Sequence, residues 1–240
     1  MTTASDEPAR VDSGERSYET LVFDLDRTLV EHDQSFADVF EAACAACGIE
    51  PFCGPEALDR ATRLVGRQST GVDAETFDRR VFETVAAAAG VAIDSTEFAN
   101  AYDDALDNGA VSLRPGASAA LAAAEDYDTA LVTNGPERTH ATKLEAVGIE
   151  DRFDAVVFGS DVARVKPAVD PLERALERLD SGPSRTLKVG DSLAKDVASA
   201  NELGIDSAWI PDGNRTRASN DPEPTYVLSS LGDLPDVLSK

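Results

Sequence analysis

The chain has little cysteine, few aromatic residues and no long hydrophobic run. Its three cysteines, Cys44, Cys47 and Cys53, are too few for a disulfide framework, and a zinc site would need a fourth ligand. Cys44 and Cys47 fall three residues apart on an Ala-rich helical pattern, which predicts buried small side chains rather than metal ligands. Because no apolar run approaches the length of a membrane span, we expect no membrane partner.

Lysine is also scarce. Only 5 of the 22 basic residues are Lys, and 45 acidic residues give a net charge of −23. Such a surface repels nucleic acid and anionic membranes, so neither is an expected partner. Heavy acidity with Arg in place of Lys favours adaptation to a salt-rich cytoplasm, where screening weakens self-repulsion. An acidic protein of an ordinary cytoplasm is the alternative interpretation.

Residues 1–18 are polar and acidic and lack the hydrophobic core of a signal peptide. They predict a mobile tail on a cytoplasmic protein. With 240 residues, 42% of them hydrophobic, the chain is long enough for one core domain of ordinary size and a smaller insertion.

Two carboxylates follow a short apolar run in the sequence TLVFDLDRTLV, residues 20–30. Residues 21–23 predict a buried strand, and Asp24 and Asp26 follow it at a spacing of two. A parallel strand that ends this way delivers both acids to the carboxyl edge of a sheet, where open α/β folds bind ligands. There, one carboxylate could attack an electrophile while the other moves protons.

Residues 32–112 contain no strongly strand-like run and several helical patterns. Such a segment is too long for a connection between strands and too apolar for disorder. We therefore predict a helical cap domain over residues 32–112, inserted into an α/β core domain of residues 19–31 and 113–240, where it could close like a lid. Helices are expected around residues 34–48, 55–65, 74–89 and 95–108.

From residue 113 onward, strand and helix patterns alternate. This alternation predicts the fold class, an α/β protein with a doubly wound parallel, Rossmann-like sheet. Strands are expected at residues 129–133, 155–158, 186–189 and 207–210, helices at 117–125, 136–147, 169–180 and 193–203, a short edge strand at 226–228 and a last helical turn at 233–238.

Polar residues follow three of these strands. Thr133, Asn134 and Gly135 offer a hydroxyl and backbone amides that suit a phosphate oxygen at the start of a helix. Lys166, placed before the next helix, could neutralise charge on a transferring phosphoryl group. Asp191 follows the fourth strand, and together with Asp24, a backbone carbonyl and water it would form a plausible Mg²⁺ site.

The segments FDLDRTL, VTNG, VKP and GDSLAKD occur in the order and context of the four motifs of the haloacid dehalogenase superfamily. The chain resembles the phosphatases of that superfamily, in particular the phosphoglycolate phosphatase-like branch with a helical cap. The resemblance covers residues 20–238. It implies a Mg²⁺-dependent phosphatase that hydrolyses a small phosphorylated metabolite, as a monomer or homodimer.

For the first motif, the resemblance implies that Asp24 attacks phosphorus and forms an aspartyl-phosphate. Asp26 would protonate the leaving oxygen and then activate water, and its backbone carbonyl would bind the metal. Thr28 would position the Asp26 loop by hydrogen bonding.

For the other motifs, the resemblance implies that Thr133 and Asn134 hold phosphoryl oxygens and that Lys166 bridges phosphate and nucleophile. Asp191 would bind Mg²⁺. Asp196 would support the metal through water or orient Lys166.

Asp26 separates the functional alternatives within the superfamily. The dehalogenases lack this second acid, so its presence favours phosphate ester chemistry. A phosphomutase of the same fold and a noncatalytic protein that keeps the fold for partner binding stay open as alternatives. The intact set of acids and lysine argues against the noncatalytic one.

Several further residues allow two interpretations. Arg27 replaces the Gly, Asp or Asn often found at its position, and its side chain could point outward or touch substrate. His32 is a polar loop residue or assists substrate binding at the cap. Arg63 and Arg67, beside a turn at residues 66–71, could face an anionic substrate or balance surface charge.

His140 lies on an expected helix and is assigned no role.

Overall fold

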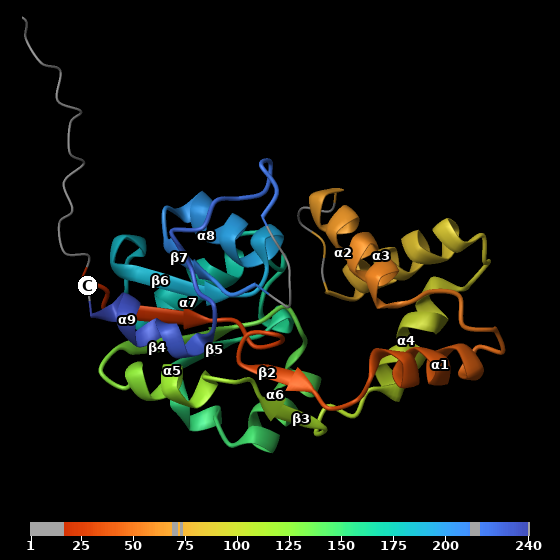
Figure 1. Cartoon of the computed structure of the whole chain (residues 1–240), viewed down its shortest axis with the longest axis horizontal. Helices are drawn as coiled ribbons and strands as arrows, with labels where there is room; N and C mark the ends of the chain where they lie inside the picture. The colour runs from red at the N-terminus through yellow and green to blue at the C-terminus, as the bar shows by residue number, and fades with distance from the viewer. Residues whose placement is uncertain (1–16, 69–71, 73, 212–216, 240) are drawn as a thin grey trace, which may run out of the picture.

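The computed structural model describes residues 17–68, 72, 74–211 and 217–239. Residues 1–16 of the predicted tail and residues 69–71 of the predicted turn lie outside the described residues. Figure 1 shows two lobes, one built around a sheet and one built from four helices. No helix in the described ranges is long and apolar enough to cross a membrane.

Six parallel strands form the main sheet, in the order β5-β4-β1-β6-β7-β8. The chain fills the sheet from β1 in both directions, so the strand order reverses at β1. In folds of this kind the crevice at the reversal point, outside the carboxyl ends of the strands, binds ligands. The prediction of a doubly wound parallel sheet is confirmed. The strands are β1 (Thr20–Phe23), β4 (Asp128–Val132), β5 (Ala155–Val157), β6 (Thr186–Gly190), β7 (Asp206–Trp209) and β8 (Tyr226–Val227).

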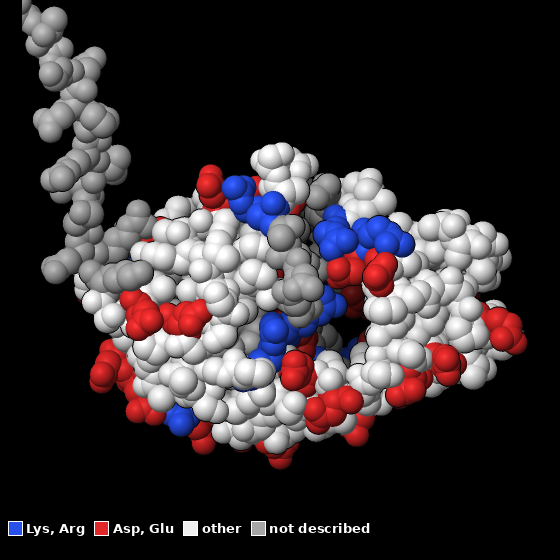
Figure 2. All heavy atoms as spheres, in the orientation of Figure 1, with Lys and Arg blue, Asp and Glu red and all other residues white. Residues whose placement is uncertain are grey.

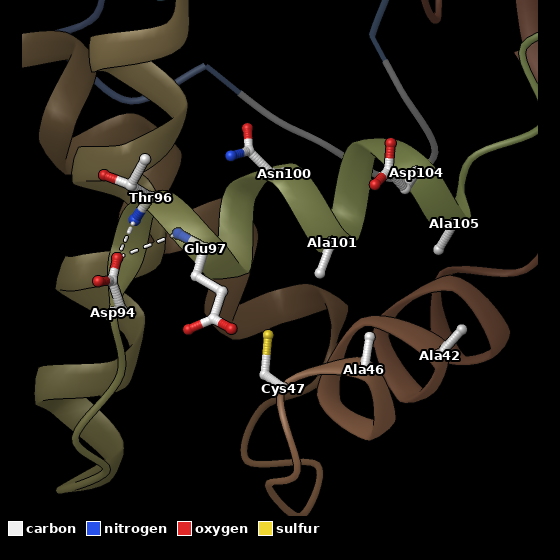
Figure 3. Close-up of a pocket in the computed structure, with 10 residues that line it drawn as sticks. All are labelled: Ala42, Ala46, Cys47, Asp94, Thr96, Glu97, Asn100, Ala101, Asp104 and Ala105. Atoms are coloured by element: carbon white, nitrogen blue, oxygen red, sulfur yellow. Dashed lines mark hydrogen bonds between the residues drawn. The ribbon is translucent and has the colours of Figure 1, made fainter.

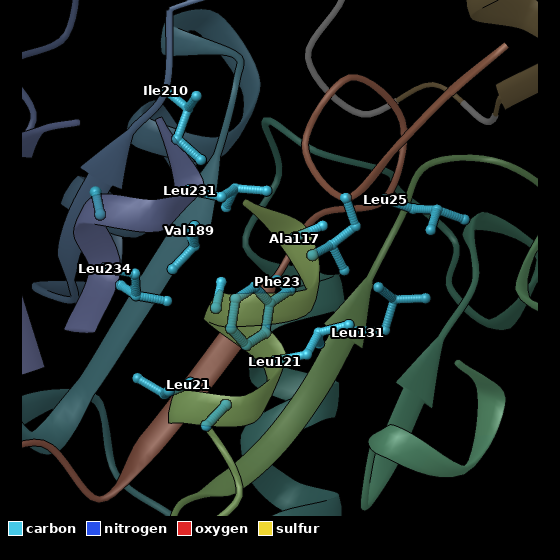
Figure 4. Close-up of a cluster of buried hydrophobic side chains, with 14 of the residues drawn as sticks. Leu21, Phe23, Leu25, Ala117, Leu121, Leu131, Val189, Ile210, Leu231 and Leu234 are labelled. Carbon is cyan, nitrogen blue, oxygen red and sulfur yellow. The ribbon is translucent and has the colours of Figure 1, made fainter. Parts of the chain in front are cut away.

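The central strand β1 is buried on both faces, which is why its sequence reads as a continuous run without polar alternation. On one face, Leu21 and Phe23 pack against helices α5 and α9, as Figure 4 shows. On the other face, Val22 packs against α7 and α8. The helices are α5 (Ala117–Ala123), α6 (Glu137–Val147), α7 (Asp170–Leu179), α8 (Ala198–Leu203) and α9 (Leu234–Leu238).

The helical lobe has a core of its own, built from aromatic side chains. Phe98 is fully buried, and its ring centroid lies 5.4 Å from that of Phe40 and 5.0 Å from that of Phe82. Asp94 caps one of the helices by accepting hydrogen bonds from two backbone amides of its first turn. The four helices of the lobe lie where the sequence predicts them: α1 (Phe36–Ala46), α2 (Pro55–Gln68), α3 (Ala74–Ala89) and α4 (Ser95–Ala105).

Two details differ from the sequence-based expectation. The chain passes between the lobes through an antiparallel ribbon of β2 (Val30–His32) and β3 (Val111–Leu113), whereas no strand was expected there. These short strands pair across about eighty residues, so neither carries a local signal of its own. The expected helix at 193–203 begins with a π-helical turn, Leu193–Val197, before α8.

Candidate active site

The structure brings together four of the predicted site residues, Asp24, Lys166, Asp191 and Asp196. Asp24 follows β1 and Asp191 follows β6, so the parallel register carries both to the same edge of the sheet. Lys166 reaches this edge from the segment between β5 and α7. The residues are at most 7% exposed, so their charges interact in a largely water-free setting.

Lys166 donates a hydrogen bond with each of its three ammonium hydrogens. Its Nζ lies 2.6 Å from Asp24 Oδ1, 2.7 Å from Asp196 Oδ1 and 2.8 Å from the backbone oxygen of Val132. Burial alone would lower the pKa of Lys166, but the two carboxylates outweigh burial and raise it. The side chain is therefore a fixed positive charge against the Asp24 carboxylate.

Asp24 has a hydrogen-bond donor at each oxygen. Thr28 Oγ1 donates to Oδ2 at 3.0 Å, while Lys166 occupies Oδ1. The Thr28 hydroxyl thus contacts Asp24, while the Thr28 backbone amide donates to the backbone oxygen of Leu25 in the loop that carries Asp26. These two donors fix the orientation of the Asp24 carboxylate.

Three buried carboxylates form a group that could hold a metal ion. Ligand oxygens of Asp24, Asp191 and Asp196 lie within 4.8 Å of one another. Burial and the repulsion from its two neighbours raise the pKa of Asp191 to about 7. A divalent cation would relieve this repulsion, and carboxylate oxygens are the hard ligands that Mg²⁺ prefers. Trp209 Nε1 donates to the backbone oxygen of Asp191 at 2.7 Å and so fixes the chain there.

A second buried lysine, Lys188 on β6, shares the Asp196 carboxylate. Asp196 Oδ1 lies 2.7 Å from Lys166 Nζ and 3.1 Å from Lys188 Nζ, and Oδ2 accepts from the backbone amide of Ser192 at 3.2 Å. Although burial opposes ionisation, the two ammonium groups lower the pKa of Asp196 to about 2. No local pattern pointed to Lys188 as a site residue, because it lies within a strand and not after one.

The Asp26 side chain points to α6 and makes a separate cluster. His140 Nε2 lies 2.7 Å from Asp26 Oδ2, and Lys143 Nζ lies 2.7 Å from Oδ1. Burial would raise the pKa of Asp26, but His140 and Lys143 hold it well below its usual range. Both α6 residues were missed in the sequence. Their spacing of three places them on one helix face, which is the only local signal they carry.

The loop after β4 is held against the Lys166 segment. Asn134 Nδ2 donates to the backbone oxygen of Lys166 at 2.8 Å, and Asn134 Oδ1 accepts from its amide at 3.0 Å. Both polar atoms of the Asn134 side chain are therefore engaged by the backbone of Lys166. Thr133 is 2% exposed, and its Oγ1 accepts from the Gly135 amide at 3.4 Å.

Gly135 packs against the ring of His140. A Cβ at this position would lie 1.7 Å from His140 Cε1, so the close approach requires glycine.

Arg27 and Arg63 meet at one carboxylate between the lobes. Arg27 Nη1 lies 3.5 Å from Asp59 Oδ1, and Arg63 Nη1 lies 2.8 Å from Asp59 Oδ2. Arg27 adopts φ 60, the left-handed region, which explains why small or Asx residues suit this position. Arg67 lies in α2, and its side chain is outside the described set.

His32 lies in the β2–β3 ribbon between the lobes. Its buried Nδ1 has no hydrogen-bond partner within the described ranges, and burial lowers the pKa of the ring. The charge of Lys143 also lowers the pKa of His32, so the ring lies within electrostatic reach of the Asp26 cluster.

The groove in Figure 3 is a different place on the molecule from the candidate active site. On the face in Figure 2, Lys and Arg side chains gather around the hollow between the lobes, next to some acidic side chains, while other Asp and Glu side chains spread over the outer surface. The groove in Figure 3 lies between α1 and α4 and is lined by alanines and acids such as Asp94, Glu97 and Asp104. None of the predicted site residues lines that groove.

A doubly wound sheet whose carboxyl edge gathers buried aspartates around a lysine defines an α/β enzyme with carboxylate chemistry. The sequence profile described as haloacid dehalogenase-like hydrolase matches residues 21–210. The chain belongs to the haloacid dehalogenase-like hydrolase family, and the resemblance seen in its four motifs is confirmed.

Individual relatives agree with this assignment. The chain is 32% identical to phosphoglycolate phosphatase from Cereibacter sphaeroides over 226 residues, 91% of this chain and 96% of that protein. It is 32% identical to N-acylneuraminate-9-phosphatase from Mus musculus over 109 residues, 45% of this chain but only 44% of that protein. The magnesium-bound HAD-hydrolase YfnB from Bacillus subtilis shares the fold, with a TM-score of 0.75 at 21% identity, covering 93% of this chain and 100% of that one.

Proposed function

We propose that this protein is a Mg²⁺-dependent phosphatase that hydrolyses a small phosphate monoester through an aspartyl-phosphate. The observation that carries the proposal is the Asp24 carboxylate, buried beside two further acids and fixed by the Lys166 ammonium at 2.6 Å. The phosphatase names of relatives such as the one matched over 91% of this chain support it.

In the first half of the reaction, an Asp24 oxygen attacks phosphorus and the bond from phosphorus to the leaving oxygen breaks. The negative charge of a bound phosphate would raise the pKa of Asp26 and favour its protonated form in the substrate complex. Asp26 then gives its proton to the leaving oxygen, so the product leaves as an alcohol. Lys166 and the backbone amides of Asn134 and Gly135 would balance the charge on the phosphoryl oxygens.

In the second half, water attacks the phosphorus of the aspartyl-phosphate and gives a proton to Asp26. The bond between Asp24 and phosphorus breaks, which restores the carboxylate and releases inorganic phosphate. Mg²⁺ bound by Asp24, Asp191 and the Asp26 backbone carbonyl, with Asp196 nearby, would supply Lewis-acid stabilisation of the phosphoryl group.

The helical lobe would serve as a cap domain over residues 32–112. Contacts that join the lobes support this role: Arg27 with Asp59, and Arg138 on α6 with Asp103 on α4 at 3.3 Å. The basic side chains around the hollow in Figure 2 would attract an anionic substrate to an otherwise acidic protein.

A panel of phosphate esters, assayed in high potassium chloride with and without Mg²⁺, tests the proposal. We expect metal-dependent release of phosphate that Asp24→Asn abolishes. Asp126→Asn is a suitable control, because Asp126 is exposed and precedes β4, at the other edge of the sheet. Phosphate release by Asp24→Asn at the wild-type rate would refute the mechanism. Conversion of a hexose phosphate to its isomer without phosphate release would identify a phosphomutase instead.

A further inference from the structure

Asp26 is held at both oxygens by side chains of one helix. His140 Nε2 and Lys143 Nζ each lie 2.7 Å from a different oxygen of its carboxylate. The Asp26 side chain is 38% exposed, whereas the side chains of His140 and Lys143 are 9% and 4% exposed. Two buried donors thus fix the orientation of the partly exposed Asp26 carboxylate.

The donor chemistry is consistent at each oxygen. A carboxylate only accepts, so His140 must carry hydrogen on Nε2, and the ammonium of Lys143 donates by necessity. Both hydrogen bonds are charge-assisted because their acceptor is an ionised carboxylate, and such bonds are stronger than those between neutral groups. Rotation of the carboxylate about its last bond would break both contacts.

The local packing is arranged around this contact. His140 can approach only because Gly135 has no side chain, since a Cβ would overlap the imidazole. Thr139 Oγ1 lies 3.0 Å from the other ring nitrogen, Nδ1, and so fixes the ring plane. Lys143 places a buried charge here, which is costly unless the Asp26 carboxylate is present.

We propose that His140 and Lys143 are positioning residues that aim the Asp26 carboxylate for its proton transfers. This inference rests on the proposed function, in which Asp26 is the acid for the leaving group. Within the described ranges, the His140 and Lys143 side chains hydrogen-bond to Asp26 and make no hydrogen bond to Asp24 or Lys166, so their effect passes through Asp26. Misplacement of a reacting group by about 1 Å can cost a factor of about 10² in rate.

The dependence of the rate on the leaving group separates this role from a structural one. An alkyl phosphate needs protonation of its leaving oxygen, whereas p-nitrophenyl phosphate has a leaving group that departs without it. The value of kcat/KM reports the steps up to departure of the leaving group and excludes later hydrolysis of the aspartyl-phosphate. A loss of general folding or phosphate binding would affect both substrates equally.

The variants are His140→Leu, Lys143→Met and His140→Gln, with Thr142→Val at an exposed position of the same helix as control. For His140→Leu and Lys143→Met we expect kcat/KM on an alkyl phosphate to fall about 10- to 10³-fold, within the usual range for general acid catalysis. On p-nitrophenyl phosphate the loss should stay below about 3-fold. His140→Gln keeps a donor and should restore most of the alkyl phosphate activity.

A double-mutant cycle completes the test. Asp26→Asn should show the same selective loss, and adding His140→Leu to it should change the ratio of the two substrates no further. Equal losses on both substrates, or no loss in either variant, would overturn the inference. If His140→Leu does not fold, the result for Lys143→Met alone decides. If Asp26→Asn itself lacks selectivity, the acid role of Asp26 in the proposed function fails, and the positioning role fails with it.

Discussion

Lys188 Nζ lies 3.1 Å from Asp196 Oδ1, the same oxygen that Lys166 binds at 2.7 Å. Both lysines are almost completely buried, yet their pKa values move in opposite directions. Two carboxylates raise the pKa of Lys166, whereas burial lowers that of Lys188 to about 8 despite its contact with Asp196. The protein interior therefore favours the charge of Lys166 and opposes that of Lys188.

Replacing Lys166 by Met should destabilise the protein, whereas replacing Lys188 by Met should not. Lys166→Met leaves Asp24 uncompensated, and breaking a buried pair in this way costs about 3–5 kcal/mol. Lys188→Met removes an unfavourable buried charge while Asp196 keeps Lys166, so the free energy of unfolding should stay the same or rise. Urea unfolding at pH 7 without Mg²⁺ measures both values. A large destabilisation by Lys188→Met would contradict this account.

Asp191 should make the metal-free protein less stable as the pH rises. Its pKa is raised from 3.8 to about 7, so the folded state binds more protons than the unfolded state between these values. Stability from this group is therefore present at low pH and is lost as the pH rises through about 7. Thermal unfolding in a chelator, compared with Asp191→Asn, should show the loss in wild type only.

Mg²⁺ should reverse that trend, because it binds the ionised carboxylate. The rise in Tm caused by Mg²⁺ should be larger at pH 8 than at pH 5. An equal rise at both values would argue against a site that contains Asp191.

Gly135→Ala should displace the imidazole of His140 from Asp26. The new Cβ would overlap the ring, which must rotate away and lose its contact with Oδ2. We expect the same selective loss on alkyl phosphates as for His140→Leu, together with any effect on phosphate binding by the loop. The ratio of kcat/KM for alkyl and p-nitrophenyl phosphates measures it. An unchanged ratio would show that the ring keeps its contact in another way.

Salt should stabilise the protein. With a net charge of −23, repulsion between acidic side chains opposes the compact state, and screening shortens its range from about 10 Å at 0.1 M to about 3 Å at 1 M salt. Tm should therefore rise as potassium chloride increases from about 0.1 to about 1 M. A constant or falling Tm would favour the interpretation as an acidic protein of an ordinary cytoplasm.

Most of the fold could be predicted from the sequence because its signals are local. Each signal depends only on neighbours along the chain. The signals are the hydrophobic run of β1, the alternation of strand and helix patterns after residue 113, and the helical periodicity of α1 to α4. The antiparallel pairing of β2 with β3 could not be predicted, since it depends on the two ends of the helical segment meeting.

The order of residues alone shows that four polar segments follow strands, and parallel strands bring such ends to one edge of the sheet. The charged groups that touch one another are known only from the three-dimensional packing. Packing of elements far apart in the chain brings Lys188 of β6 to Asp196. It likewise brings His140 and Lys143 of α6 to Asp26. A contact of that kind depends on distance and burial in three dimensions, and residue type and spacing do not encode either one.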